Sequence, residues 1–238
     1  MKKNKILYIK FFKRYGPLIL IMTFFSGIVL TSFYFILQPK ITLPIYSPNM
    51  VSIELVEEDI RYVKKYHKIS DFSLTNQNGK TITQEYYDNQ IYIADFFFTT
   101  CPSICPIMTE NMFQIQEKTM EDNVLLVSYS VTPEIDSVAQ LKKYALEKGV
   151  NDNKWNLLTG DKKQIYDLAR KSYLVAKNDG DGGKYDMIHT ENFVLIDKEK
   201  RIRGFYDGTN KEEMVKLLND FKILENSYKN SKNEKINI

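Results

Sequence analysis

Cysteine, histidine and tryptophan are scarce in this chain, whose 238 residues include two cysteines, two histidines and one tryptophan. Two cysteines are too few to form the disulfide scaffold of a secreted protein. A tetrahedral structural zinc site would need both histidines in addition to the cysteine pair, because the chain has no further Cys or His. The two cysteines, Cys101 and Cys105, are separated by only three residues. This close spacing favours chemistry at one small site over structural cross-linking.

Excess positive charge is also missing from most of the chain. Lys and Arg total 33 and Asp and Glu total 30, but residues 1–16 contain six cations and no acid. The rest of the chain therefore has 27 cations against 30 acids, a net charge of −3. Proteins that bind nucleic acid need a basic surface to neutralise phosphates, so no nucleic-acid partner is expected. The 43% share of hydrophobic residues is enough for one full-sized core.

A long apolar run follows the basic residues. Leu18 to Leu37 is a stretch of twenty residues without a charge. At about 1.5 Å per residue, a helix of this length spans roughly 30 Å, the thickness of the hydrocarbon core of a bilayer. No small-residue cleavage site follows, so we expect an uncleaved membrane anchor over residues 17–38. The basic arm at residues 1–16 places the amino terminus in the cytoplasm and the remainder of the chain outside the membrane.

The pattern of the exported part predicts an α/β domain over residues 69–224, between a tether at 39–68 and a polar tail at 225–238. Alternation and continuous apolar runs predict a hairpin around Asn78-Gly79 and strands at 91–98, 124–131, 191–197 and 201–207. Helical spacing of apolar residues predicts helices at 106–121, 136–148, 162–171 and 211–224, the second with Asp136 as its N-cap. This order predicts a thioredoxin-like fold, in which helices flank a central mixed sheet, with an added amino-terminal hairpin.

Cys101 and Cys105 follow the first buried strand directly, at the sheet edge where ligand and redox groups gather in folds of this kind. In a helical segment, residues four apart share a face, with Cα atoms about 6 Å from each other. The two sulfurs can then bind one metal ion or form a disulfide, and both options remain open. Amides at the start of a helix favour the thiolate, which is the form that binds metals and attacks disulfides.

Only His67 and His189 can add an imidazole to the cysteine pair. His189 is the better candidate because it starts a predicted strand, whereas His67 lies in the tether and is expected in solvent. Two thiolates and one imidazole suit copper, since soft thiolates favour Cu(I) and an imidazole keeps Cu(II) accessible. Met187 is a weaker candidate for a fourth ligand, and Met108 and Met112 are expected in the core.

Three segments together resemble the SCO/SenC family: TTCPSICP around the cysteines, SVTPEID at residues 130–136, and IHTENFVLID with its histidine. Members are membrane-anchored, thioredoxin-like proteins that handle copper for cytochrome c oxidase. The resemblance implies that Cys101, Cys105 and His189 bind copper, as Cu(I), Cu(II) or both. It implies a metallochaperone that assists assembly of the binuclear copper centre, with the oxidase copper subunit or another copper-handling protein as partner. Residues 1–16 lack the composition of a mitochondrial transit peptide, so we expect a bacterial cytoplasmic membrane and a periplasmic domain.

A second class of function remains open for the same residues. In a thiol-disulfide oxidoreductase, either Cys101 or Cys105 would attack a target disulfide and the other would resolve the mixed disulfide. Ordinary dithiol oxidoreductases use Cys-x-x-Cys, which is one residue shorter than the spacing here. We therefore expect a copper chaperone rather than an enzyme, with the oxidoreductase as the alternative. Replacement of His189 separates the two, because only metal transfer needs the imidazole.

Overall fold

Residues 2–37, 42–56, 58, 61–63, 67–177, 183 and 186–236 are described in the computed structural model of the chain. The chain divides into two compact units, residues 1–41 and 42–238. The first unit is formed by one helix, α1 (Lys2–Leu37). The Lys13–Leu37 part of α1 has 25 residues and a mean hydropathy of 2.1, and it is the one helix among the described residues that is long and apolar enough to cross a membrane. The apolar run therefore forms the expected helix.

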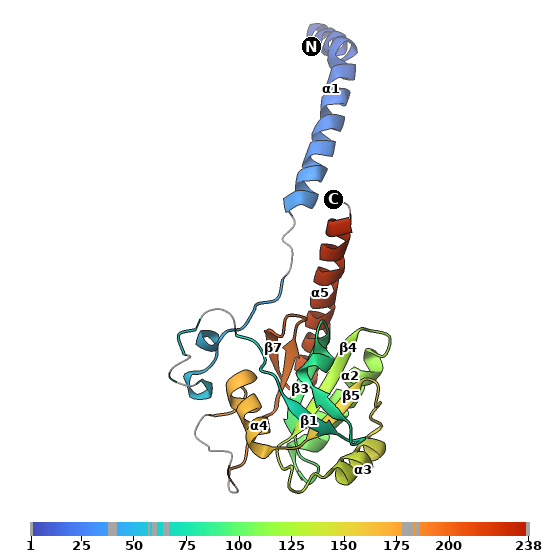
Figure 1. Cartoon of the computed structure of the whole chain (residues 1–238). Helices are drawn as coiled ribbons and strands as arrows, with labels where there is room; N and C mark the ends of the chain where they lie inside the picture. The colour runs from blue at the N-terminus through green and yellow to red at the C-terminus, as the bar shows by residue number, and fades with distance from the viewer. Residues whose placement is uncertain are drawn as a thin grey trace. The chain divides into compact units, whose positions relative to one another are not determined.

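The second unit is built on a seven-stranded mixed sheet in the order β2-β1-β5-β4-β3-β6-β7 (Figure 1). The three central strands, β5, β4 and β3, are parallel, and antiparallel strands extend the sheet at both sides. The strands are β1 (Ser73–Asn76), β2 (Thr81–Thr83), β3 (Ile91–Phe97), β4 (Val124–Ser130), β5 (Trp155–Thr159), β6 (Asn192–Ile196) and β7 (Ile202–Asp207). Every residue of β3 and β5 is buried, as expected where helices cover both faces of a sheet.

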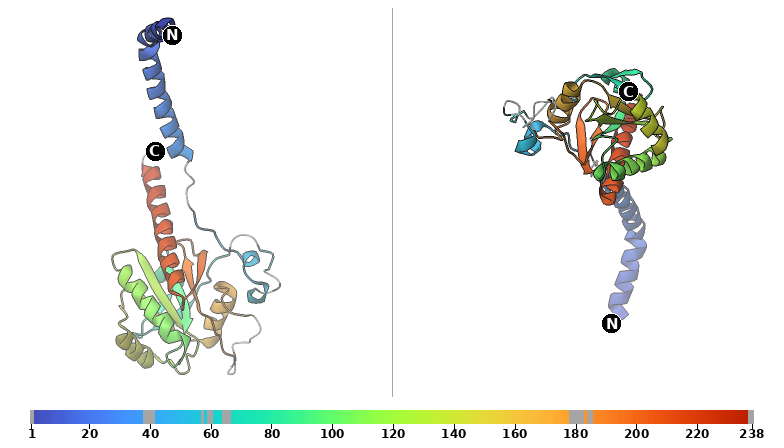
Figure 2. Two further views of the ribbon diagram at one scale, coloured as in Figure 1. Left: turned by 180° about the vertical axis from the view of Figure 1, so that it is seen from behind. Right: turned by 90° about the horizontal axis from the view of Figure 1, so that it is seen from below.

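Helices pack on both faces of this sheet. The helices are α2 (Ile104–Lys118), α3 (Val138–Lys148), α4 (Lys162–Asp167), which continues as the π-helical turn η4 (Leu168–Ser172), and α5 (Lys211–Ile236). Apolar side chains of α2, α3 and α5 share one core cluster, and those of α4 and η4 belong to the other. Figure 2 shows α2, α3 and α5 together in the view from behind. The expected sheet with flanking helices and an amino-terminal hairpin, β1–β2, is confirmed.

One strand, β5, was not predicted. It has five residues, WNLLT, and pairs with β4 on one side and with β1 on the other. Trp155, the single tryptophan of the chain, begins this strand and is 1% exposed. A short buried strand gives no period-two alternation, because both of its faces are apolar. Pairing with strands distant in sequence therefore decides its conformation.

The start of α3 also differs from the prediction. Ser137, and not Asp136, caps this helix: its hydroxyl oxygen accepts a hydrogen bond from the Gln140 amide at 3.3 Å. The end of α3 is as expected, because Gly149 adopts the left-handed conformation with φ of 71°. The Asp136 side chain does not cap α3 and can therefore form hydrogen bonds elsewhere in the fold.

The last helix is longer than expected. The sequence predicts an end at Leu224, whereas α5 continues to Ile236. Tyr228 packs against the core cluster of α2, α3 and α5, and its hydroxyl donates a hydrogen bond to Glu199. Lys229 forms an ion pair with Glu225 one turn earlier, at 2.9 Å. These contacts stabilise part of the segment 225–238 that was predicted to be a polar tail.

Residues 42–56 pack on the domain before the hairpin begins. The Tyr46 amide donates to the Ile202 carbonyl oxygen at 2.9 Å, which attaches the segment to β7. The Arg203 guanidinium donates to the carbonyl oxygens of Leu43 and Pro44 at 2.7 and 2.8 Å. The compact unit therefore begins at residue 42, inside the segment 39–68 that was assigned to a tether.

Candidate functional site

Cys101 and Cys105 lie where β3 passes into α2. The Cys101 amide donates to the carbonyl oxygen of Phe98 at 3.3 Å, which closes a tight turn just after the strand. Cys105 is the second residue of α2, so its amide has no partner within the helix. This amide donates instead to the Cys101 Sγ at 3.4 Å. Both thiols are free and little exposed, at 9% for Cys101 and 3% for Cys105.

The two thiols have opposite pKa shifts. Burial alone would raise the pKa of Cys101, but hydrogen bonds from the Ser103 amide and from the thiol and amide of Cys105 lower it to about 7. Burial raises the pKa of Cys105 to about 12, and the neighbouring Cys101 contributes to that rise. Near neutral pH, Cys101 is therefore partly thiolate while Cys105 keeps its proton.

A buried carboxylate fixes the loop that leads to Cys101. Asp136 is 0% exposed and accepts hydrogen bonds from the Thr99 hydroxyl at 2.5 Å and the Thr99 amide at 3.2 Å. It also accepts from the hydroxyls of Ser130 at 2.6 Å and Thr132 at 3.2 Å. Asp136, expected only as a helix cap, thus joins the end of β3, the end of β4 and the loop before α3.

Asp95 is a second acid near the cysteines, and the sequence reasoning missed it. It lies within β3, is 2% exposed, and its Oδ1 has no hydrogen-bond partner among the described residues. Burial raises the pKa of Asp95 to about 7, against a lowering by its hydrogen bond with Ser128. Its charge also contributes to the raised pKa of Cys105. The available signal was an acid inside an otherwise apolar strand. Burying such a side chain costs free energy, so its presence there can indicate a functional role.

His189 lies in the segment that leads into β6. Its side chain is exposed, and its ring meets the ring of Phe98 edge-on, with centroids 6.5 Å apart. Because the Phe98 carbonyl accepts the Cys101 amide, His189 lies beside the cysteine turn. Across the described part of the chain, no three His, Cys, Asp or Glu side chains are gathered as a metal site. The structure therefore brings two of the three predicted donors together and leaves the imidazole against Phe98, open to solvent.

The remaining candidates have clear positions. His67 is half-buried, with its Nε2 2.7 Å from the Ser172 carbonyl oxygen, so the expectation of a solvated histidine was wrong. Met108 and Met112 are 0% exposed and lie in the core, as predicted. Met187 is 43% exposed and lies two residues before His189.

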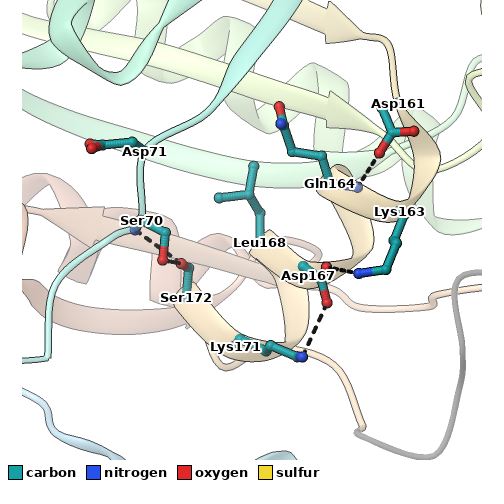
Figure 3. Close-up of a pocket in the computed structure, with 9 residues that line it drawn as sticks. All are labelled: Ser70, Asp71, Asp161, Lys163, Gln164, Asp167, Leu168, Lys171 and Ser172. Carbon is teal, nitrogen blue, oxygen red and sulfur yellow. Dashed lines mark hydrogen bonds and ion pairs between the residues drawn. The ribbon is translucent and has the colours of Figure 1, made fainter.

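A pocket of about 340 Å³ lies beside α4 and η4, and neither cysteine lines it (Figure 3). Three of its charged side chains pair with one another: Asp167 with Lys163 at 2.6 Å and with Lys171 at 3.4 Å. The hydroxyls of Ser70 and Ser172 are hydrogen-bonded at 2.6 Å. Since these groups already have partners, we assign the pocket no role in the chemistry of the cysteines.

Comparison with known proteins adds to this geometry. The SCO1/SenC family model matches residues 61–221. The SCO1 protein homolog of Bacillus subtilis is 32% identical over 161 residues, which cover 66% of this chain and 82% of that protein.

Solved structures agree in fold. BsSco, a member of the Sco family of cytochrome c oxidase assembly proteins, matches with a TM-score of 0.58 and 30% identity, covering 67% of this chain and 94% of BsSco. Copper-bound ScoI of Arabidopsis thaliana matches with a TM-score of 0.51 and 26% identity, covering 64% of this chain and 97% of that one. The second unit thus has the thioredoxin-like fold of these proteins. Since the family model spans more than half of its residues, the chain belongs to the SCO1/SenC family.

Proposed function

We propose that this protein is a membrane-anchored copper chaperone. It binds copper through Cys101, Cys105 and His189 and assists assembly of the binuclear copper centre of cytochrome c oxidase. The observation that carries the proposal is the free thiol pair at the start of α2, with the Cys105 amide bonded to the Cys101 sulfur at 3.4 Å. The oxidase-assembly role of Sco proteins and the copper bound to ScoI of Arabidopsis thaliana support it.

The donors fit copper in number and kind. Two sulfurs within one helical turn are soft ligands, and soft ligands select Cu(I). The lowered pKa of Cys101, about 7, makes its thiolate available near neutral pH. Cys105 must lose a proton on binding, so copper uptake releases protons and weakens in acid. His189 completes a three-coordinate set when its ring turns from Phe98 toward the sulfurs.

A three-coordinate site suits a protein whose cargo is copper. It leaves one side of the metal open to an incoming thiolate or imidazole of the acceptor, and the metal can then move by ligand exchange. The acceptor in this proposal is the copper subunit of the oxidase or another copper-handling protein. Cys101 and Cys105 follow the carboxyl end of β3 and are 9% and 3% exposed, so the acceptor would approach the copper from that end of the sheet.

The topology belongs to the same proposal. Helix α1 anchors the chain in a bacterial cytoplasmic membrane, with the six cations of residues 1–16 in the cytoplasm and the second unit in the periplasm. An impermeant thiol reagent added to intact cells tests this arrangement. It labels Cys101 if the domain is outside, and the opposite topology predicts labelling only after lysis.

The second candidate function is thiol-disulfide exchange, and the pKa difference between the two cysteines favours it. The Cys101 thiolate would attack a target disulfide and release one target sulfur as a thiolate. Cys105, once deprotonated, would then attack the mixed disulfide, leaving an oxidised Cys101–Cys105 pair and a reduced target. A disulfide switch has been identified in BsSco, which supports thiol-disulfide chemistry as the second candidate function.

The deciding experiment titrates the reduced, full-length protein in detergent micelles with Cu(I) and separately with Cu(II). We expect one copper per chain and a thiolate-to-Cu(II) charge-transfer band. His189→Ala should lose the band, and His67→Ala, a change at the other histidine of the chain, should keep it. If neither wild type nor His189→Ala retains copper while both cycle the Cys101–Cys105 disulfide, the chaperone proposal is wrong and the oxidoreductase remains.

A further inference from the structure

The segment that carries His189 presents a second potential copper donor. Ile188 and Thr190 are 4% and 5% exposed, whereas Met187 is 43% exposed and His189 is exposed. Alternating burial of this kind is typical of extended chain, in which side chains two residues apart point to the same side. Met187 and His189 therefore share the solvent-facing side of the segment, with Cα atoms roughly 6 to 7 Å apart.

The segment is anchored at both ends. The Asp186 carboxylate accepts two hydrogen bonds from Arg170, at 2.7 and 2.8 Å, and the Asp186 carbonyl oxygen accepts one from Tyr166 at 3.0 Å. At the other end, the Thr190 hydroxyl oxygen accepts a hydrogen bond from the Asn192 amide at 3.2 Å. These contacts hold the backbone, so Met187 and His189 stay on one side and only their side chains need to move.

The chemistry of the pair is specific. A thioether and an imidazole are both ligands of Cu(I), and neither has to lose a proton to bind it. Met120 is also 43% exposed, but no histidine is close to it in sequence. Its sulfur lies 4.0 Å from the side-chain amide of Asn151. Of the two histidines, His67 is held at Ser172, so only His189 combines an exposed ring with a neighbouring exposed methionine.

We propose that Met187 and His189 form a landing site for Cu(I), separate from the cysteine pair. Copper binds first to the thioether and the imidazole. It then passes to Cys101 and Cys105, with His189 retained as a shared ligand. This inference rests on the proposed copper function and adds to it the route by which the cargo enters.

Transfer from this site is simple ligand exchange. Copper remains Cu(I) throughout, so no oxidant or reductant is needed. The Cys101 thiolate displaces the neutral thioether of Met187, and the Cys105 thiol gives its proton to water as its sulfur binds the metal. His189 contacts the ring of Phe98, whose carbonyl accepts the Cys101 amide, so the shared ligand lies near the turn that carries the receiving sulfur.

The test uses full-length protein in micelles with both cysteines replaced by serine and with ¹³C-labelled methionine methyl groups. Ag(I), a diamagnetic ion with the ligand preference of Cu(I), is the probe. We expect Ag(I) to shift the Met187 methyl signal and the His189 ring signals in NMR spectra. Met187→Leu should remove the shift of the ring signals, and Met120→Leu, a change at an equally exposed methionine, should leave it unchanged.

A kinetic measurement on protein with intact cysteines complements the spectra. Met187→Leu should take up Cu(I) from a chelator more slowly than wild type while reaching the same final stoichiometry. The inference is overturned if Ag(I) leaves the Met187 signal in place, or if it shifts Met120 and Met187 equally. Copper uptake by the cysteines of wild type in that case leaves the chaperone proposal standing. A Met187 shift, together with loss of the His189 ring shift in Met187→Leu, supports the landing site even where wild type fails to retain copper on its cysteines.

Discussion

The unequal pKa values of the cysteines predict selective alkylation. At pH 7, Cys101 with a pKa of about 7 is about half thiolate, whereas Cys105 with a pKa of about 12 is thiolate in about one molecule in 10⁵. A more basic thiolate is intrinsically more nucleophilic, so each Cys105 thiolate reacts about 100 to 300 times faster than a Cys101 thiolate. We therefore expect iodoacetamide to modify Cys101 about 200 to 500 times faster than Cys105.

Mass spectrometry of the reduced, full-length protein after timed quenching gives both rates. Cys101→Ser and Cys105→Ser variants assign each rate to one sulfur. Because the thiolate is the reactive form, the Cys101 rate should rise with pH and level off above about pH 7, the pKa of that thiol. Equal rates for the two cysteines, or a Cys101 midpoint near the ordinary thiol pKa of about 8.5, would refute the role assigned to the amides of α2.

Three further predictions concern the buried charges. Asp95 has its pKa raised from 3.8 to about 7, so the folded state favours its protonated form. The free energy of unfolding, measured in urea titrations, should therefore fall by about 4 kcal/mol from pH 4 to pH 8. Asp95→Asn should remove this fall. Asp136→Asn deprives four hydrogen-bond donors of a charged acceptor and should lower the free energy of unfolding by about 3 kcal/mol. Ser137→Ala, which removes the cap of α3, should lower it by about 1 kcal/mol. Equal losses would contradict the role of the Asp136 hydrogen bonds. Arg203→Ala should speed hydrogen exchange at the Tyr46 amide and leave the amides of α2 unchanged, since it removes the guanidinium that holds the chain next to Tyr46.

Much of the sheet could be predicted because its strands are strongly apolar. The strands β3, β4, β6 and β7 coincide with the predicted runs to within one or two residues. The hairpin β1–β2 followed from Asn78-Gly79, because Gly79 has a φ of 74° that glycine adopts without strain. The sheet order and the strand β5 depend on contacts between residues far apart in sequence, and no local pattern records them.

The site was only partly visible for similar reasons. The spacing of Cys101 and Cys105 identified the thiol pair, and the structure brings them together. The sequence could not show that Asp136 would serve the loop before Cys101 while the adjacent Ser137 capped α3, since both residue types suit a helix start. Asp95 was overlooked because a single acid does not disturb the apolar pattern of a strand.

The segment before the hairpin has a practical consequence for fragment design. The family model matches residues 61–221, but the compact unit that contains them is larger and begins at residue 42. A fragment cut at those boundaries would lose Val56 and Leu224, each 1% exposed, and the Tyr46 ring that packs edge-on against Phe205 at 5.1 Å. Val56 and Leu224 each contribute about 1.5 to 3 kcal/mol by burial, so their combined loss is comparable with the lower end of the stability of a typical domain, about 5 kcal/mol. A soluble version of this protein should therefore begin at residue 42 and retain α5 at least through Tyr228.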